Sequence, residues 1–260
     1  VDRLVGSEMC IRDRICLQYS TQWDSLCHVG GWFDADGDGK PEVVYYNGWR
    51  GDEHIVSPKE KIEADEFTKF EGSNAKALGI ENMAEACVQG RGVLVDLEQR
   101  HGRDRVLVGY DELMRILEED NIEIEEGDMA CFHTGFAQGL MDMNKNPNEH
   151  DLHNTFACLD GRDEKLQDWI RDSGISVIIA DNYGIEDVSS PLPTGTNPIA
   201  MLPLHELCIF KLGIHIGEMF YLTPLRDWLR KNKRNRFLLT APPLRLPGAV
   251  GSPPSPIATV

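Results

Sequence analysis

Short apolar runs alternate along the chain with stretches of helical periodicity. The apolar runs predict strands, because turn residues bound them and β-branched side chains are common within them. They lie at 90–96, 129–132, 175–180 and 236–239. The run at 175–180 is unbroken, which predicts a strand that is buried on both faces.

Apolar residues three and four positions apart predict helices between and after these runs. The predicted helices cover 82–88, 110–119, 163–172, 204–212 and 223–233. Gly174 suits the position just after a helix, and Thr223 with Pro224 suits the N-cap and first position of the last helix. Short strands that alternate with helices indicate an α/β domain.

Polar stretches interrupt this pattern in three places. Residues 51–80 are polar and charged, with Phe67 and Phe70 as their main anchors, and we predict a loop that leads into the first helix. Residues 141–160 are rich in Asn, Asp and His and also predict a loop. The proline-rich residues 242–256 predict an extended tail that either packs on a neighbour or remains loose.

The first fourteen residues show no periodicity that would place them in the fold. They mix charged and apolar side chains, and Leu4–Arg14 resembles a translated sequencing-adapter read. We therefore treat residues 1–14 as a non-native segment and expect the domain to occupy residues 15–260, without its natural N-terminus.

Composition narrows the class of protein. A chain of 260 residues, 41% of them apolar, suits one large domain or two small ones. The formal net charge of −17 argues against nucleic-acid binding, which needs a basic face. Seven scattered cysteines without a CxxC pair indicate reduced thiols in the cytoplasm. No apolar run reaches the roughly 18 residues of a membrane span, and no signal core is evident.

Residues 18–28 place an acid, an imidazole and two amides within eleven positions. On a strand, Ser20, Gln22 and Asp24 fall on one face because side chains alternate. His28 then returns to the same space just after the strand. This arrangement suits metal binding or acid–base chemistry. A polar turn near a sheet edge is the alternative.

Asp34, Asp36 and Asp38 alternate within an Asp/Gly-rich stretch that resembles half of a calcium loop. An EF-hand requires a Glu at loop position twelve, where this chain has Tyr45, and no helix flanks the stretch. A Ca²⁺ loop of another type remains open. A tight turn between two strands is the favoured interpretation.

Several predicted strands end in polar groups, where α/β folds place their sites. These groups are Asp24 with His28, His133-Thr134-Gly135, and Asp181-Asn182. His205 and Glu218 lie farther along, and a buried Glu needs a metal ion or a cation as its partner. Alternatively, His205 is a helix N-terminal residue and Glu218 faces water. HExxH, GxSxG and P-loop motifs are absent from the sequence.

Five ordered segments resemble the cyclase family of metal-dependent amide hydrolases, which includes bacterial kynurenine formamidase and isatin hydrolase. The segments are Ser20-Thr21-Gln22-Trp23-Asp24 with His28, Gly90–Asp96, His133–Gly135, Asp181-Asn182 with Glu186, and Pro203-Leu204-His205 with Gly217-Glu218. The resemblance implies a single α/β domain with a barrel-like central mixed sheet and surrounding helices. It also implies a homodimer or homotetramer and a small-molecule substrate.

The same resemblance implies an arylformamidase-like activity. Zn²⁺ or Mn²⁺ would activate water against the C–N bond of an N-formyl group or a cyclic amide, or against a lactone. The family places two early His ligands where this chain has Gln18 and Gln22, and amides are weaker ligands for zinc. We therefore expect one ion rather than two, held by Asp24, His205 and Glu218.

The resemblance also implies residue roles. His28 would be the acid/base, Thr134 or Gln22 would steady an oxyanion, and Trp23 would line the substrate pocket, although a Trp near a strand end is commonly a core residue. Two alternatives remain. The chain is a metal-free family member that acts as a binding or structural protein, or a calcium-dependent module built on Asp34, Asp36 and Asp38.

Overall fold

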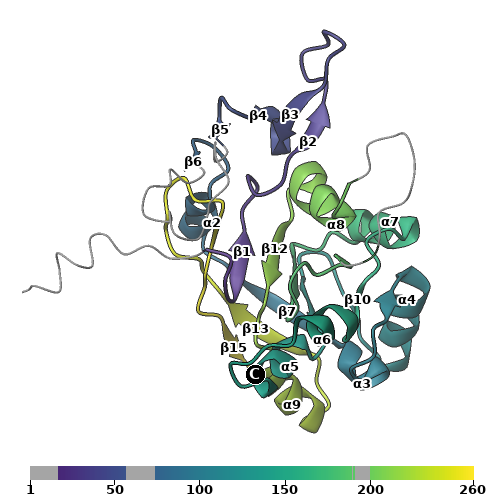
Figure 1. Cartoon of the computed structure of the whole chain (residues 1–260). Coiled ribbons are helices and arrows are strands. Elements are labelled where there is room, and N and C mark those ends of the chain that lie inside the picture. The colour runs from purple at the N-terminus through teal and green to yellow at the C-terminus, as the bar shows by residue number, and fades with distance from the viewer. Residues whose placement is uncertain (1–16, 57–73, 189, 191–199) are drawn as a thin grey trace, which may run out of the picture.

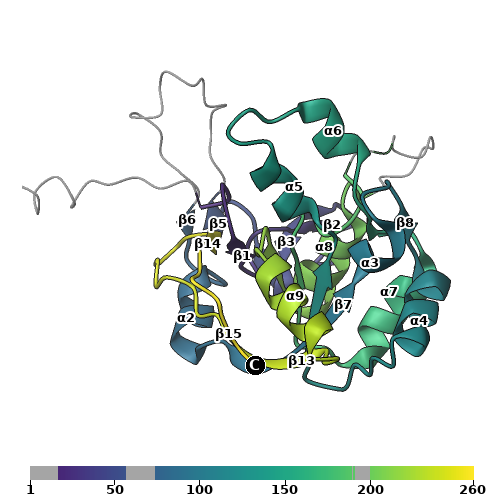
Figure 2. The same ribbon diagram turned by 90° about the horizontal axis from the view of Figure 1, so that it is seen from below.

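An eight-stranded mixed sheet forms the centre of the protein and curls into an open half-barrel (Figures 1 and 2). The computed structural model describes residues 17–56, 74–188, 190 and 200–260. The segment 1–14 and both Phe67 and Phe70 lie outside the described residues. In spatial order the strands are β14 (Gly251–Ser252), β1 (Gln22–Asp24), β12 (His215–Glu218), β11 (Val177–Ala180), β9 (Met129–His133), β7 (Gln89–Asp96), β13 (Arg236–Thr240) and β15 (Ile257–Thr259).

Four parallel strands, β12, β11, β9 and β7, make the middle of the sheet. β1 pairs antiparallel with β12, and β13 pairs antiparallel with β7. The outer strands β14 and β15 are antiparallel to β1 and β13. The predicted α/β fold with a barrel-like mixed sheet is therefore confirmed.

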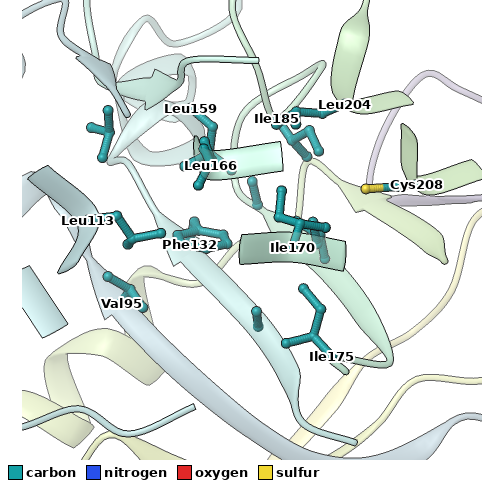
Figure 3. Packing of buried hydrophobic residues seen from close by; sticks show 14 of the residues in the cluster. Val95, Leu113, Phe132, Leu159, Leu166, Ile170, Ile175, Ile185, Leu204 and Cys208 are labelled. Carbon is teal, nitrogen blue, oxygen red and sulfur yellow. The ribbon is translucent and has the colours of Figure 1, made fainter. Parts of the chain in front are cut away.

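Helices and apolar side chains cover both faces of the central strands. Along β11, Ile178 and Ala180 pack into one core while Val177 and Ile179 pack into another. Figure 3 shows the first core, where Phe132 of β9 meets Leu166 and Ile170. The strand predicted from the unbroken apolar run at 175–180 is therefore buried on both faces, as predicted.

The first core also holds side chains from α4 (Tyr110–Glu119), α7 (Glu164–Ser173), α8 (Pro203–His205) and the π-helical segment η3 (Glu206–Leu212) that continues α8. The second holds side chains from α2 (Ile80–Ala86) and α9 (Thr223–Lys231). None of the helices within the described ranges is long and apolar enough to cross a membrane.

Most predicted helices lie within a few residues of the observed ones, and α4 matches at both ends. The N-cap predicted at Thr223 is wrong. Leu222 precedes α9 without a side-chain cap, and the Thr223 hydroxyl is instead 3.2 Å from His133 Nε2. Gly174 does follow α7 in the left-handed conformation.

The loop predicted over 141–160 is wrong, because α6 (Glu149–Asn154) and the end of α5 (Phe136–Asp142) occupy part of it. The helix α3 (Leu97–His101) and the short parallel pair β8 (Leu107–Val108) and β10 (Cys158–Leu159) were also missed. The proline-rich residues 242–256 are not loose, since β14 within them pairs with the main sheet and Pro243 bridges to Pro254.

A small antiparallel sheet projects from the body near the start of the chain (Figure 1). It contains β2 (Gly31–Phe33), β3 (Glu42–Tyr45) and β4 (Trp49–Arg50), with the single 3₁₀ turn η1 (Tyr46–Gly48) between the last two. A further pair joins β5 (Ile55–Val56) to β6 (Asn74–Ala75). Asp34 accepts hydrogen bonds from the amides of Gly37 and Gly39 at the β2–β3 turn, which confirms the predicted tight turn.

Trp23 is a core residue, and its predicted position in the substrate pocket is wrong. Its side chain is wholly buried and its ring packs edge-on against Phe220, with centroids 5.2 Å apart. The indole N–H donates to the Ala241 carbonyl oxygen at 2.7 Å. The physical reason is alternation, because Gln22 and Asp24 face one side of β1 and Trp23 faces the other.

We predict that Trp23→Phe lowers the free energy of unfolding by about 1–3 kcal/mol, since it leaves the Ala241 carbonyl unpaired and opens a cavity. Urea denaturation measures this change. Trp32→Phe is the matched control, because Trp32 is 72% exposed and its truncation should cost about 0.5 kcal/mol or less. Equal effects at the two positions would contradict this description of the core.

Candidate functional site

The pairing of β1 with β12 brings two segments that are far apart in the sequence into one site. In this antiparallel register, Gln22 lies opposite Glu218 and Asp24 lies opposite Ile216. Alternation then directs Gln22, Asp24 and Glu218 to the same side of the sheet. Gln22 Nε2 donates to Glu218 Oε2 at 3.1 Å, and all three side chains are buried.

His205 enters the same space from α8. Its imidazole is buried, with Nδ1 2.9 Å from Glu186 Oε1 and Nε2 3.2 Å from Glu218 Oε1. Burial alone lowers the pKa of His205, but the hydrogen bonds and charges of Glu186 and Glu218 outweigh it and raise the pKa to about 10. The imidazole is therefore held between two carboxylates.

Asp24 supplies a buried carboxylate with one unsatisfied oxygen. Oδ1 accepts a hydrogen bond from Gln18 at 3.2 Å, while Oδ2 has no hydrogen-bond partner among the described residues. Oδ2 lies 3.9 Å from His205 Nε2 and 4.0 Å from His28 Nε2. Burial raises the pKa of Asp24, although the neighbouring His28 opposes this effect.

These groups fit a metal ion. Asp24, His28 and His205 each offer one ligand atom, and the three atoms lie within 4.8 Å of one another. One carboxylate and two imidazoles form a set that Zn²⁺ accepts, with a position left for water. A buried oxygen without a partner is the feature that such an ion would satisfy.

The structure changes the predicted ligand set at one position. Glu218 Oε1 lies 3.2 Å from His205 Nε2, but Gly184 N donates to the same oxygen at 2.9 Å and Gln22 donates to Oε2. His28 completes the cluster instead. Asp24 and His205 belong to both sets.

The two glutamines contact the carboxylates through their N–H groups. Gln22 donates to Glu218, and Gln18 donates to Asp24 while its Nε2 also lies 3.1 Å from His28 Nδ1. An amide N–H group is a hydrogen-bond donor and not a metal ligand. The structure therefore shows Gln18 and Gln22 as partners of the carboxylates, whereas the sequence predicted them as weak ligands.

Thr134 makes its contacts with a different carboxylate. Its amide and hydroxyl both donate to Asp181 Oδ1, at 2.6 and 2.7 Å, and Gly135 N donates to Oδ2 at 2.9 Å. Burial raises the pKa of Asp181. Because both Thr134 donors are occupied, these contacts do not support the oxyanion role predicted for this residue.

A second buried network lies at the carboxyl ends of β7 and β9. His133 is fully buried, with Nδ1 3.2 Å from Asp96 Oδ1 and Nε2 beside the Thr223 hydroxyl. Arg230 of α9 pairs with Asp96 Oδ2 at 2.5 Å. His133 and Asp96 both end strands, whereas their partners Thr223 and Arg230 belong to α9. This network therefore attaches α9 to the sheet.

The Asp/Gly turn gives a second possible donor group, composed of Asp34, Asp36 and Glu42 rather than the predicted Asp38. Its carboxylates already have partners. Amides of the turn donate to Asp34, and Arg50 lies 3.6 Å from Asp36 and 3.1 Å from Glu42. The Ca²⁺ loop stays a prediction.

Sequence reasoning gave no role to Glu186, the buried partner of His205. Its carboxylate accepts hydrogen bonds from the amides of Leu204 and His205, both at 2.9 Å, besides contacting the imidazole. The family comparison had included Glu186 among the resembling residues. The only further signal was an acidic residue shortly after a strand end.

Comparisons with known proteins identify the family of this chain. The model of the family described as "Putative cyclase" matches residues 12–187. A crystal structure of "a novel cyclase" shares 27% sequence identity, with a TM-score of 0.70, over 95% of this chain and 71% of that chain. No curated protein matches the sequence.

Two more distant structures share the fold. Isatin hydrolase A from Ralstonia solanacearum is 14% identical with a TM-score of 0.55, over 92% of this chain and 70% of that one. A "potential metal-dependent hydrolase with cyclase activity" is 16% identical with a TM-score of 0.50, over 94% and 80%. The chain belongs to the cyclase family, as the sequence resemblance predicted.

We predict that the purified protein carries about one Zn²⁺ or Mn²⁺ per chain and that Asp24→Asn removes most of it, since the amide replaces the charged ligand. Metal content by mass spectrometry tests this. Asp34→Asn is the control, because it alters the exposed acidic turn and should leave the metal content unchanged. Loss of metal in Asp34→Asn, with none in Asp24→Asn, would indicate that the ion binds at the acidic turn instead.

Proposed function

We propose that this protein is a metal-dependent hydrolase of small molecules that cleaves an amide C–N bond, in an N-formyl group or a cyclic amide, or a lactone. The observation that carries the proposal is the unpartnered Oδ2 of buried Asp24 between two imidazoles. Family membership supports it, and so does the similarity to an isatin hydrolase and to a potential metal-dependent hydrolase.

Asp24 and His205 would hold the ion, with His28 at the more open side. A bound Zn²⁺ or Mn²⁺ lowers the pKa of water and polarises a carbonyl oxygen. Burial supports this role, because Asp24 is wholly enclosed and only 2% of His205 is exposed. Rigid enclosure keeps the two ligands at the distance that the ion requires.

His28 has the position of an acid/base. Its side chain is 21% exposed, whereas Asp24 is fully buried, so it can meet both substrate and solvent. It would accept a proton from the attacking water and return it to the leaving nitrogen or oxygen. Gln18, whose Nε2 is 3.1 Å from His28 Nδ1, would orient the ring.

Charge balance supports one ion rather than two. Three carboxylates lie at this place. Backbone amides and His205 engage both oxygens of Glu186, and the amides of Gln18 and Gln22 engage one oxygen each of Asp24 and Glu218. Gly184 N engages the remaining oxygen of Glu218. The oxygen that is left is Asp24 Oδ2, which suits one ion shared with His205, while His28 lies beside it.

We further propose a homodimer or homotetramer in the cytoplasm, as the family resemblance implies. The five cysteines within the described ranges are all free thiols, which supports a reducing compartment.

The contacts of Gln18 and Gln22 favour a second candidate, a metal-free binding protein, because they partly satisfy the buried carboxylates without an ion.

We predict hydrolysis of at least one of N-formylkynurenine, isatin or a simple lactone by the metal-loaded protein, and its loss after chelation. His28→Gln should lower kcat by about 10²–10⁴-fold, which is the usual contribution of a general acid or base. Its metal content separates the two roles, since an acid/base variant keeps the ion and a ligand variant loses it.

The outcomes of these assays divide the two candidate functions. A protein without metal and without activity on all three substrates favours the binding protein. Activity that survives full chelation contradicts both candidates and indicates chemistry by His28 alone.

A further inference from the structure

We propose that Glu186 is a positioning residue that fixes the direction and tautomer of His205, so that Nε2 faces the ion. This inference rests on the proposed metal site. Glu186 itself does not touch the ion position. It acts through the imidazole that it holds, and its effect should therefore appear in metal affinity.

Three hydrogen bonds support this role. Glu186 is 2% exposed, and its Oε1 lies 2.9 Å from both His205 N and His205 Nδ1, while Oε2 accepts from Leu204 N at 2.9 Å. When Nδ1 carries the proton in this hydrogen bond, the lone pair of a neutral imidazole is on Nε2. Nε2 lies 3.2 Å from Glu218 Oε1 and 3.9 Å from the open oxygen of Asp24, so it is on the side of the site where these two acids lie.

The main chain around Glu186 is fixed by neighbouring elements. Leu159 N donates to Ile185 O at 3.1 Å and Asp187 N donates to Leu159 O at 3.1 Å, which forms a bridge to β10. Two residues earlier, Gly184 N holds Glu218. The segment 184–186 therefore contacts both Glu218 and His205. A displacement of this segment would disturb both contacts together.

Gly161 provides the space that the Glu186 carboxylate needs. A Cβ atom at Gly161 would lie 1.9 Å from Glu186 Oε2 and 3.0 Å from its Cδ. The backbone of Gly161 is not in the left-handed region, so an alanine there is free of conformational strain and acts on Glu186 through contact. Gly161→Ala thus displaces the carboxylate without removing a charge.

A purely structural explanation is that Glu186 only caps α8. It does accept the first amides of this helix, and an anion at that position is favourable. Glu186→Gln separates the two explanations. Its size is the same and its amide oxygen still accepts at one of the two oxygen positions, but its NH2 group cannot accept at the other and the negative charge that strengthens His205 as a ligand is lost. The melting temperature reports the lost cap, and Zn²⁺ affinity reports the effect on His205.

The experiment compares Zn²⁺ dissociation constants of the full chain, measured by competition with a chelator, and records melting temperatures beside them. We expect Glu186→Gln and Gly161→Ala to weaken Zn²⁺ binding by about 10–100-fold, the usual effect of losing a partner of a metal-bound His. Asp181→Asn is the matched control. Asp181 is also a buried carboxylate that accepts three hydrogen bonds, but they come from Thr134 and Gly135.

The control should bind Zn²⁺ within about 3-fold of the wild type, because it leaves the ion's surroundings intact. Wild-type affinity in both Glu186→Gln and Gly161→Ala would overturn the inference and leave the metal site standing. Equal weakening in Asp181→Asn would overturn it too, since any lost buried carboxylate would then suffice. A wild-type protein that binds Zn²⁺ tightly but hydrolyses nothing rejects the proposed function and not the role of Glu186.

Discussion

The antiparallel contact between β1 and β12 is the constraint on which the site depends. It pairs the strand of Gln22 and Asp24 with the strand of Glu218, 196 positions later. Strand alternation then sends the polar residues to one side and Trp23 to the other, against Phe220. A shift of one residue in this register would bury Trp23 in the polar site and place Asp24 in the apolar core.

The site is a compromise between burial and charge. Asp24, Glu186 and Glu218 are carboxylates withdrawn from water around a single buried imidazole. Removing such groups from water is costly unless each oxygen has a partner, and every oxygen except Asp24 Oδ2 has one. The chain uses backbone amides of Gly184, Leu204 and His205 for this purpose, so the folded main chain itself is part of the electrostatic balance.

The sequence predicted the elements whose signal is local. β11 and α4 were found because an unbroken apolar run and an amphipathic period are each sufficient within a few residues. α5 was missed because it contains Gly139, and burial of Phe136 and Ala137 rather than propensity holds it. α6 was missed because it is polar and buries no residue, although the Asn148 side chain caps its first turn. Strand alternation and polar groups at strand ends singled out Asp24 and His205, and the family resemblance implied that they are metal ligands. The contacts of Glu186 come from a bridge to Leu159, which no local pattern encodes.

The pairing of β14 with β1 has a consequence for the order of folding. Gly251 and Ser252 flank the strand of Asp24, and Ser25 N donates to the Val250 carbonyl. During synthesis on the ribosome, the segment that carries Asp24 emerges long before its two neighbours in the sheet, β12 and β14. Such distant pairings close slowly. A nascent chain must therefore keep an unpaired strand, with its acid and Trp23, shielded until β12 and β14 have been synthesised.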